Sequence, residues 1–280
     1  MGDRQLQTAL ENLQEAAPAI SGHPACDQLV GLYSFPKSGN TWLRAIIIGI
    51  LEIPQRRAVL ASYVPDTHLG QPIGEMPWQH AGQTWCCYKS HNKTPLVQEG
   101  ARSFRPDKII YIYRHPLDVF LSYLNYLSGN VTGLSEKVCG FAFERVDDMT
   151  PQQMDHLFQR FTRHATFDPR PANPFGSLFE SIDNFRHLQQ AGNAVHILRY
   201  EDLIADFESS ISSIYEFLNL PQRAEDPARV QRLSDDLTRC DGKFFWKRKT
   251  GTHRDYLDAA QIDVFWQTHA KHMTMLGYSR

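Results

Sequence analysis

The chain has 280 residues, of which 42 % are hydrophobic and 21 % are charged, and this ordinary globular usage excludes disordered and fibrous classes. Its 29 basic and 31 acidic side chains give a net charge of −2, which disfavours a nucleic-acid binder. The longest apolar run, Ala45 to Leu51, is too short for a membrane span, and five cysteines without a CxxC pair predict a reduced, cytoplasmic protein.

Residues 1–25 carry leucine and alanine at helical spacing and predict an N-terminal helical lead-in. An apolar run over 29–35 predicts a buried strand, and 41–51 predicts a buried helix after an intervening turn. Three further strands and two further helices are expected at 85–89, 108–113 and 194–200 and at 117–127 and 209–218. Strands that alternate with helices predict a three-layer α/β/α fold with a central parallel sheet.

Two stretches do not fit this alternation. Residues 54–82 are rich in proline and glycine, and 128–176 contain a turn-prone tract. We expect both to be surface excursions from one domain over residues 1–280, placed where they can cover a site.

The turn after the first strand predicts an anion site. Backbone N–H groups of Ser38, Gly39, Asn40 and Thr41 stand at a helix N-terminus beside Lys37, where the helix dipole and unpaired donors favour phosphate. A Walker A loop has glycine directly before its lysine, whereas here Lys37 comes first and Gly39 follows it, which argues against an ordinary ATP or GTP hydrolase. An ordinary strand-to-helix connection is the alternative.

Two more side chains follow predicted strands, at the sheet edge where open α/β folds bind ligands. A neutral His91 imidazole there is suited to act as a general base at pH 7. Arg114, with Ser122 about two helical turns on, is suited to clamp a second phosphate. The alternative is that Arg114 pairs with Asp118 on the helix surface.

Residues 243–254 form the densest basic run, which predicts a loop over a polyanionic ligand or a solvated basic face. A nucleic-acid patch is the third and least favoured alternative, because it would be one basic run on a slightly acidic chain. The sequence has no HExxH pair, no Cys/His set of zinc-finger spacing and no GxSxG turn. Metal-dependent and serine-dependent hydrolysis therefore lack their usual signatures.

In this order along one chain, the motifs resemble those of the sulfotransferases that use 3′-phosphoadenylyl sulfate (PAPS), of the cytosolic or bacterial small-molecule type. The likeness extends from about residue 30 to about residue 256. Five segments carry it, at 35–42, 89–91, 114–123, 175–179 and 199–203. The resemblance implies the P-loop-like nucleotide-binding fold of that family.

The resemblance also implies which residues hold the donor. The 5′-phosphosulfate loop and its adenine-stacking tryptophan correspond to Pro36, Lys37, Ser38, Gly39, Asn40, Thr41 and Trp42. Arg114 and Ser122 would hold the 3′-phosphate, and Tyr200 would contact the adenine end. The family's closing loop corresponds to Arg248, Lys249, Thr250 and Gly251, with Thr250 standing where the family has glycine.

The implied reaction is transfer of a sulfuryl group from PAPS to a hydroxyl, or less readily an amine, of a small or medium-sized acceptor, with release of 3′-phosphoadenosine 5′-phosphate (PAP). His91 would be the general base, Lys37 would meet charge on the leaving oxygen and Lys89 would assist at the sulfuryl oxygens. No metal is expected. The alternatives are a nucleotide or small-molecule kinase of related fold and an inactive PAP-binding protein.

Neither the identity of the acceptor nor the oligomeric state follows from the sequence. Residues 54–82 and 128–176 are expected to shape the acceptor pocket. Their aromatic residues favour an apolar or ring-bearing acceptor and are Tyr63, Trp78, Phe141 and Phe143. The alternative, and the commoner case for loop aromatics, is that these side chains pack under their own loops.

Overall fold

The computed structural model describes residues 20–54, 59–129, 133–239 and 249–280. Most of the helical lead-in expected over residues 1–25 therefore lies outside the described residues. Its last part is not helical, because Ile20–Ser21 forms a short strand, β1, that pairs with a neighbouring strand. The helical spacing of apolar residues stops before this strand, because prolines stand at positions 18 and 24 on either side of it.

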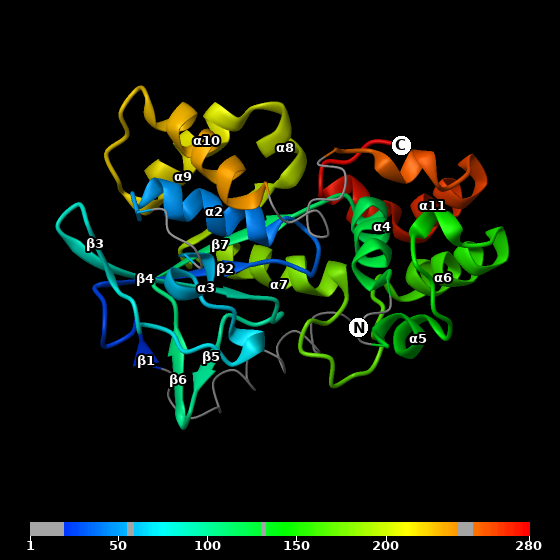
Figure 1. Cartoon of the computed structure of the whole chain (residues 1–280), viewed down its shortest axis with the longest axis horizontal. Coiled ribbons are helices and arrows are strands. Elements are labelled where there is room, and N and C mark those ends of the chain that lie inside the picture. Colours follow the sequence, from blue (N-terminus) through cyan, green and yellow to red (C-terminus); the bar gives the residue numbers. More distant parts are fainter. Residues whose placement is uncertain (1–19, 55–58, 130–132, 240–248) are drawn as a thin grey trace.

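A five-stranded sheet forms the centre of the fold (Figure 1). In spatial order its strands are β3 (Trp78–His80), β4 (Gln83–Ser90), β2 (Gln28–Tyr33), β7 (Lys108–Tyr113) and β8 (Val195–Arg199). Neighbours from β4 to β8 pair in parallel, which confirms the central parallel sheet, whereas β3 pairs antiparallel with β4. A hairpin edge strand of this kind is common on otherwise parallel sheets.

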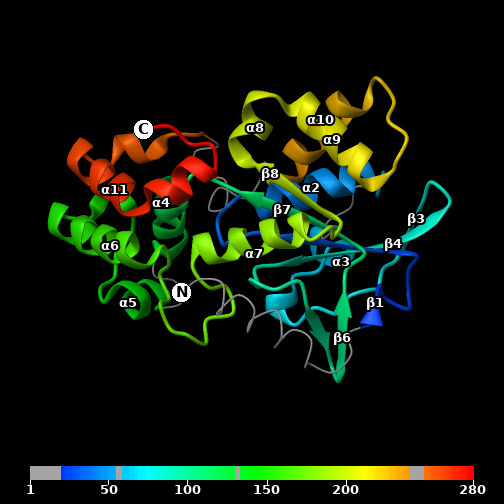
Figure 2. The ribbon, with the colours of Figure 1, turned by 180° about the vertical axis from the view of Figure 1, so that it is seen from behind.

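Helices cover both faces of the sheet and complete the expected three layers (Figures 1 and 2). One face packs on α2 (Asn40–Ile50), α9 (Phe207–Leu218) and α10 (Asp226–Thr238), and the other packs on α7 (Leu178–Gln190). Strand β2 is apolar on both faces, which explains why helices cover both. Val30 and Leu32 pack in the core on the α2 side, whereas Leu29 and Tyr33 pack in the core on the α7 side. Alternate residues of a strand point to opposite faces.

A group of helices gathers beyond the C-terminal end of β7 (Figure 1). Its members are α4 (Pro116–Leu127), α5 (Leu134–Cys139), α6 (Pro151–His164) and α11 (Ala259–Met275). The segment 128–176 therefore contains two helices and contributes to the core, rather than being only a surface excursion. Helix α6 begins at a capping box of Thr150 and Gln153 and buries Phe161 against Phe120 of α4.

The remaining elements are short. A second sheet has the order β1-β6-β5, with β5 at Val97–Glu99 and β6 at Arg102–Arg105. The short helices are α3 (Val59–Tyr63) and α8 (Tyr200–Ala205), and the 3-10 turns are η1 (Thr67–Leu69), η2 (Val146–Asp148) and η3 (Thr252–Asp255). Across the described residues, none of these helices has the length and apolarity that a bilayer crossing needs.

Candidate active site

The loop between β2 and α2 turns sharply at Gly39, which precedes the first residue of the helix. Gly39 has φ of +105°, a conformation that L side chains rarely adopt. A Cβ atom there would lie 2.7 Å from Cδ2 of Tyr200, so only glycine fits against that ring. The glycine of the predicted anion loop thus has a steric reason as well as a conformational one.

The same loop leaves buried polar atoms without partners. Ser38 is 1 % exposed, and within the described part of the chain its Oγ has no hydrogen-bond partner. Asn40 is buried too, and its Nδ2 donates to the Leu32 carbonyl and to Ser34 Oγ, both at 3.1 Å, which fixes the loop on β2. A buried hydroxyl without a partner is costly, so Ser38 points to a bound group that supplies one.

The start of α2 adds further donors to this position. The first-turn N–H groups of a helix, here those around Asn40 and Thr41, have no partner within the helix and carry its positive dipole end. The first turn holds no acidic side chain that would compete with an anion. Lys37 Nζ lies 4.6 Å from the centre of the Tyr126 ring of α4. Buried Pro36 continues the loop, and the whole arrangement fits a phosphate or sulfate group.

Tyr200, at the start of α8, brings three predicted site segments together. Its ring lies against Gly39, makes an edge-to-face contact with Trp42 at 5.7 Å, and carries the Arg114 guanidinium 4.5 Å above it. Trp42 also stacks on Phe207 at 5.8 Å. A cavity of about 200 Å³ opens beside Trp42, Tyr200 and Phe207, and its aromatic walls suit a flat heterocycle. Phe207 was not anticipated from the sequence.

Arg114 and Asp118 hold the predicted closing loop at Lys249 and at its last residue, Gly251. Arg114 donates from Nη2 to the Lys249 carbonyl at 2.8 Å, and its buried Nε has no partner among the described residues. Asp118 is fully buried and accepts hydrogen bonds from the N–H of Gly251 at 2.7 Å and from His253 Nδ1 at 2.8 Å. Asp118 is therefore a buried anchor for this loop rather than a surface partner of Arg114.

The other closing-loop and phosphate residues are only partly defined. Lys249 and Thr250 are exposed, Gly251 is half-buried, and Arg248 lies outside the described residues with most of the basic run. Ser122 is half-buried on α4, one helical turn after Asp118, so it lies on the face that meets the loop. Burial alone would raise the pKa of Asp118, but hydrogen bonds from His253 and the charge of Arg114 hold it below its ordinary value.

His91, just after β4, is held in one tautomer. Its Nδ1–H donates to the Ser34 carbonyl at 2.8 Å, which leaves the lone pair on Nε2 available to accept a proton. Burial, together with the positive charge of Lys89, holds the pKa of His91 well below its usual range. The imidazole is therefore neutral at pH 7, as a general base requires.

A second histidine supports His91 and was not anticipated from the sequence. His68 Nε2 accepts the backbone N–H of His91 at 2.7 Å, and the two rings stack at 5.5 Å. Phe175 meets both rings edge-on, at 4.7 Å from His68 and 5.9 Å from His91. One of twelve histidines in a turn gives no sequence signal of this contact.

Lys89 forms a buried ion pair with Asp66. Its Nζ lies 2.5 Å from Oδ2 of Asp66, and both side chains are mostly buried. Burial lowers the pKa of Lys89, although the Asp66 carboxylate opposes that change. Its charge nevertheless acts on the pKa of His91, so Lys89 contributes to the electrostatics of this end of the sheet.

A second cavity, of about 420 Å³, shares no lining residue with the Trp42 cavity. Its walls include Phe35 and Pro36 of the loop and Tyr123, Phe167 and Phe175. Because Phe175 also touches His91, this cavity lies close to the candidate base.

The four loop aromatics expected at the acceptor pocket are not among the residues that line this cavity. Tyr63 and Trp78 pack edge-to-face at 5.7 Å, and Phe141 lies 6.0 Å from Phe143. Each pair thus packs within its own segment, as aromatic side chains of long loops commonly do. The cavity takes its aromatic walls from Phe35 and Tyr123, among others, instead.

Comparisons with known proteins agree with this geometry. The sulfotransferase domain family model matches residues 27–277. Cytosolic sulfotransferase 7 of Arabidopsis thaliana is 23 % identical over 72 % of this chain and 60 % of its own length, so the chain spans less than two thirds of that relative. Sulfotransferase 2B1 of Mus musculus is 26 % identical over 88 % of this chain and 72 % of its own. The crystal structure of mouse sulfotransferase SULT7A1 complexed with PAP has the same fold, with a TM-score of 0.57, 17 % identity and coverage of 91 % and 86 %.

Proposed function

The chain belongs to the sulfotransferase domain family, and we propose that it transfers a sulfuryl group from PAPS to a hydroxyl, or less readily an amine, of a small or medium-sized acceptor, releasing PAP. The observation that carries the proposal is the buried Ser38 hydroxyl, without a partner in the described residues, at the N-terminus of α2. A relative of the same fold was crystallised with PAP, which agrees with this assignment.

Each part of PAPS has a matching group of residues. Ser38, Gly39 and the first-turn N–H groups of α2 would hold the 5′-phosphosulfate, with Lys37 beside them. Arg114 would hold the 3′-phosphate together with Ser122 and the closing loop, because its buried Nε still lacks a partner among the described residues. Trp42 and Tyr200 would bound the adenine cavity.

His91 would act as the general base. Bound PAPS supplies the sulfuryl group and a phosphate that leaves readily, so the protein needs mainly to position the partners and to neutralise charge. The acceptor hydroxyl would give its proton to Nε2 of His91, whose Nδ1–H stays bonded to the Ser34 carbonyl. Lys37 would neutralise charge on the leaving side, and Lys89 would act through its field on His91. None of these roles requires a metal.

The acceptor would enter the cavity beside Phe35, Tyr123 and Phe175. Aromatic walls of this kind favour an apolar or ring-bearing hydroxyl compound. We further propose that the chain acts as one domain over residues 1–280 in the cytoplasm, as the name of its cytosolic relative suggests.

Calorimetric titration with PAP, with ADP as the comparison and EDTA present, tests the donor assignment. We expect micromolar or tighter binding of PAP and much weaker binding of ADP, because ADP lacks the 3′-phosphate that Arg114 would hold. Ser38→Ala should weaken both nucleotides, whereas Arg114→Met should weaken only PAP. Equal affinities in the unaltered protein, or binding that requires Mg²⁺, would contradict the proposal and favour a kinase.

A further inference from the structure

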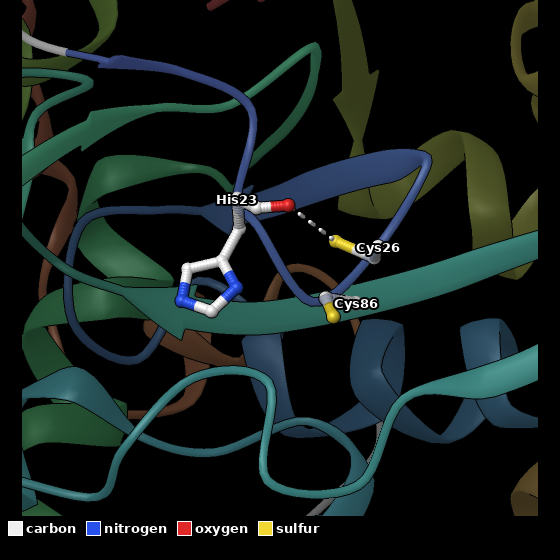
Figure 3. Close-up of side chains that lie close together, drawn as sticks. All are labelled: His23, Cys26 and Cys86. Atoms are coloured by element: carbon white, nitrogen blue, oxygen red, sulfur yellow. Dashed lines mark hydrogen bonds between the residues drawn. The ribbon is translucent and has the colours of Figure 1, made fainter.

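A cluster of soft ligands lies on the connection between β1 and β2. His23 and Cys26 belong to this connection, and Cys86 projects from the neighbouring strand β4 (Figure 3). One imidazole nitrogen of His23 and the two sulfur atoms all lie within 4.8 Å of one another. The three residues are far apart in sequence, so only the fold brings them together.

This cluster is separate from the donor site. Cys86 lies in the first half of β4 and is paired in register with Leu29, near the start of β2. His91 follows the opposite end of β4, about 16 Å away at roughly 3.3 Å for each residue of strand. No residue proposed above for PAPS belongs to the cluster.

Two thiols and an imidazole are ligands that Zn²⁺ prefers in proteins. Zinc bonds to sulfur are about 2.3 Å and bonds to nitrogen about 2.0–2.1 Å, so tetrahedral ligand atoms stand about 3.5–3.8 Å apart. The three atoms of the cluster, within 4.8 Å of each other, would have to close by only roughly 1 Å. The connection that carries His23 and Cys26 is outside any helix or strand and can make this adjustment.

The His23 ring is already oriented as metal-bound imidazoles are. Its Nε2 lies 3.2 Å from a carboxylate oxygen of Glu99, an arrangement that commonly fixes the tautomer of a histidine ligand. Phe104 packs on the ring at 4.7 Å, and a Cβ at Gly74 would come within 2.7 Å of Cε1, so the ring has little freedom. Nδ1 faces the sulfur atoms instead. It accepts the N–H of Ala25 at 3.2 Å, the long end of the hydrogen-bond range, so a metal ion can replace that contact.

We propose that His23, Cys26 and Cys86 bind one Zn²⁺ ion, with water as the fourth ligand. The ion would tie the β1–β2 connection to β4 and, through Glu99 of β5, link the small sheet to the central one. Because it lies at the far end of the strands from His91, the ion would stabilise the fold and take no part in sulfuryl transfer. The failure of one proposal would therefore leave the other intact.

Cys87 provides a matched control for the cluster. It is adjacent to Cys86 on β4 and equally buried, at 4 % against 3 % exposure, but it points into the opposite core. Cys87→Ala and Cys86→Ala therefore each remove one buried thiol group from β4, but only Cys86→Ala removes a proposed ligand.

The test is a titration of the full-length, chelator-stripped protein with Zn²⁺ against a chromophoric chelator, with a phosphine reductant present, and a parallel Co²⁺ titration read by absorption. We expect one Zn²⁺ per chain and thiolate-to-cobalt charge-transfer bands in the unaltered protein and in Cys87→Ala. Cys26→Ser and His23→Gln should weaken binding by at least about 100-fold, and Glu99→Gln by about 10- to 100-fold. Zn²⁺ should raise the Tm of Cys87→Ala but not that of Cys26→Ser.

Cys26 is only half-buried, so Cys26→Ser is expected to fold and can be titrated with Zn²⁺ even if Cys86→Ala does not fold. Circular dichroism of each variant establishes that a loss of binding is not a loss of structure. The proposal is overturned if the reduced protein binds no stoichiometric Zn²⁺, or if Cys26→Ser and His23→Gln bind it as tightly as Cys87→Ala. It is also overturned if Cys26 and Cys86 form a disulfide that persists in the presence of the reductant.

Discussion

Replacing Asp118 by asparagine tests whether the buried carboxylate holds the closing loop in place for the 3′-phosphate. Asp118 has no exposed surface and accepts hydrogen bonds from the N–H groups of Gly251 and His253, from Thr252 Oγ1 and from His253 Nδ1, at 2.7 to 3.2 Å. Asparagine keeps one acceptor oxygen and turns an NH₂ group towards the remaining donors. At least one hydrogen bond is lost, and one buried donor is left without a partner.

The size of the effect follows from those contacts. A hydrogen bond to a charged group contributes about 1.5–3 kcal/mol, and an unpaired buried donor costs about 1–3 kcal/mol. We therefore expect Asp118→Asn to lower the free energy of unfolding by about 3 kcal/mol, or the Tm by roughly 6–12 °C. If part of this energy is lost by release of the loop, the fraction of protein ready to bind PAP falls, and PAP affinity falls by about 10- to 100-fold.

Calorimetry with PAP and ADP separates this positioning role from general destabilisation. ADP lacks the 3′-phosphate, so its affinity should change little, and the preference for PAP should collapse. Asp226→Asn is the matched control, because Asp226 is another buried carboxylate at a helix N-terminus, paired with Arg223 and Arg229. It should lower the Tm without changing the ratio of the two affinities. An unchanged ratio in Asp118→Asn would refute the reasoning.

Substitutions of His91 and Gly39, and the pH dependence of the rate, give three further predictions. His91→Gln should lower kcat by about 10²- to 10⁴-fold with PAP affinity unchanged, and a loss below tenfold in a single-turnover assay would contradict its role. His91 acts as a base when it is neutral, and its pKa lies well below the ordinary 6.5. We therefore expect kcat/KM to stay constant as the pH is lowered through 6.5 and to fall only at lower pH. A decline of kcat/KM centred at or above pH 6.5 would contradict the role of His91. Gly39→Ala, at φ of +105° and 2.7 Å from the Tyr200 ring, should weaken PAP binding by about 1–2 kcal/mol or more, measured by calorimetry beside its Tm.

The central sheet could be predicted because its strands are apolar on both faces. Residues 108–113 match β7 at both ends, and the other three expected strands differ from β2, β4 and β8 by at most two residues at either end. A parallel sheet also places the residues after its strands at one edge, which is why His91 and Arg114 could be selected from sequence position alone. In these segments the local pattern of apolar residues predicts the same strands that the folded sheet contains.

The contacts that complete the site could not be predicted, because they join distant segments. Asp118 meets His253 across 135 residues, and His68 meets His91 from a turn without periodicity. Helix α6 is different, since Thr150-Pro151 with Gln153 is a helix start visible in the sequence. The cluster of His23, Cys26 and Cys86 has no zinc-finger spacing, because one ligand comes from a neighbouring strand.

At the end of β8, neighbouring residues connect the proposed donor site with the loop around Gly251. Tyr200 lies under the guanidinium of Arg114, and the next residue, Glu201, accepts the N–H of His115 at 2.9 Å, at the start of α4. The His115 ring in turn stacks on His253 at 4.3 Å, next to the carboxylate that anchors the loop. Burial of His115, with the nearby charge of His253, lowers its pKa to about 3, so this stack stays uncharged on that side at neutral pH. Tyr200 and the loop around Gly251 are therefore joined by a chain of contacts through Glu201, His115 and His253.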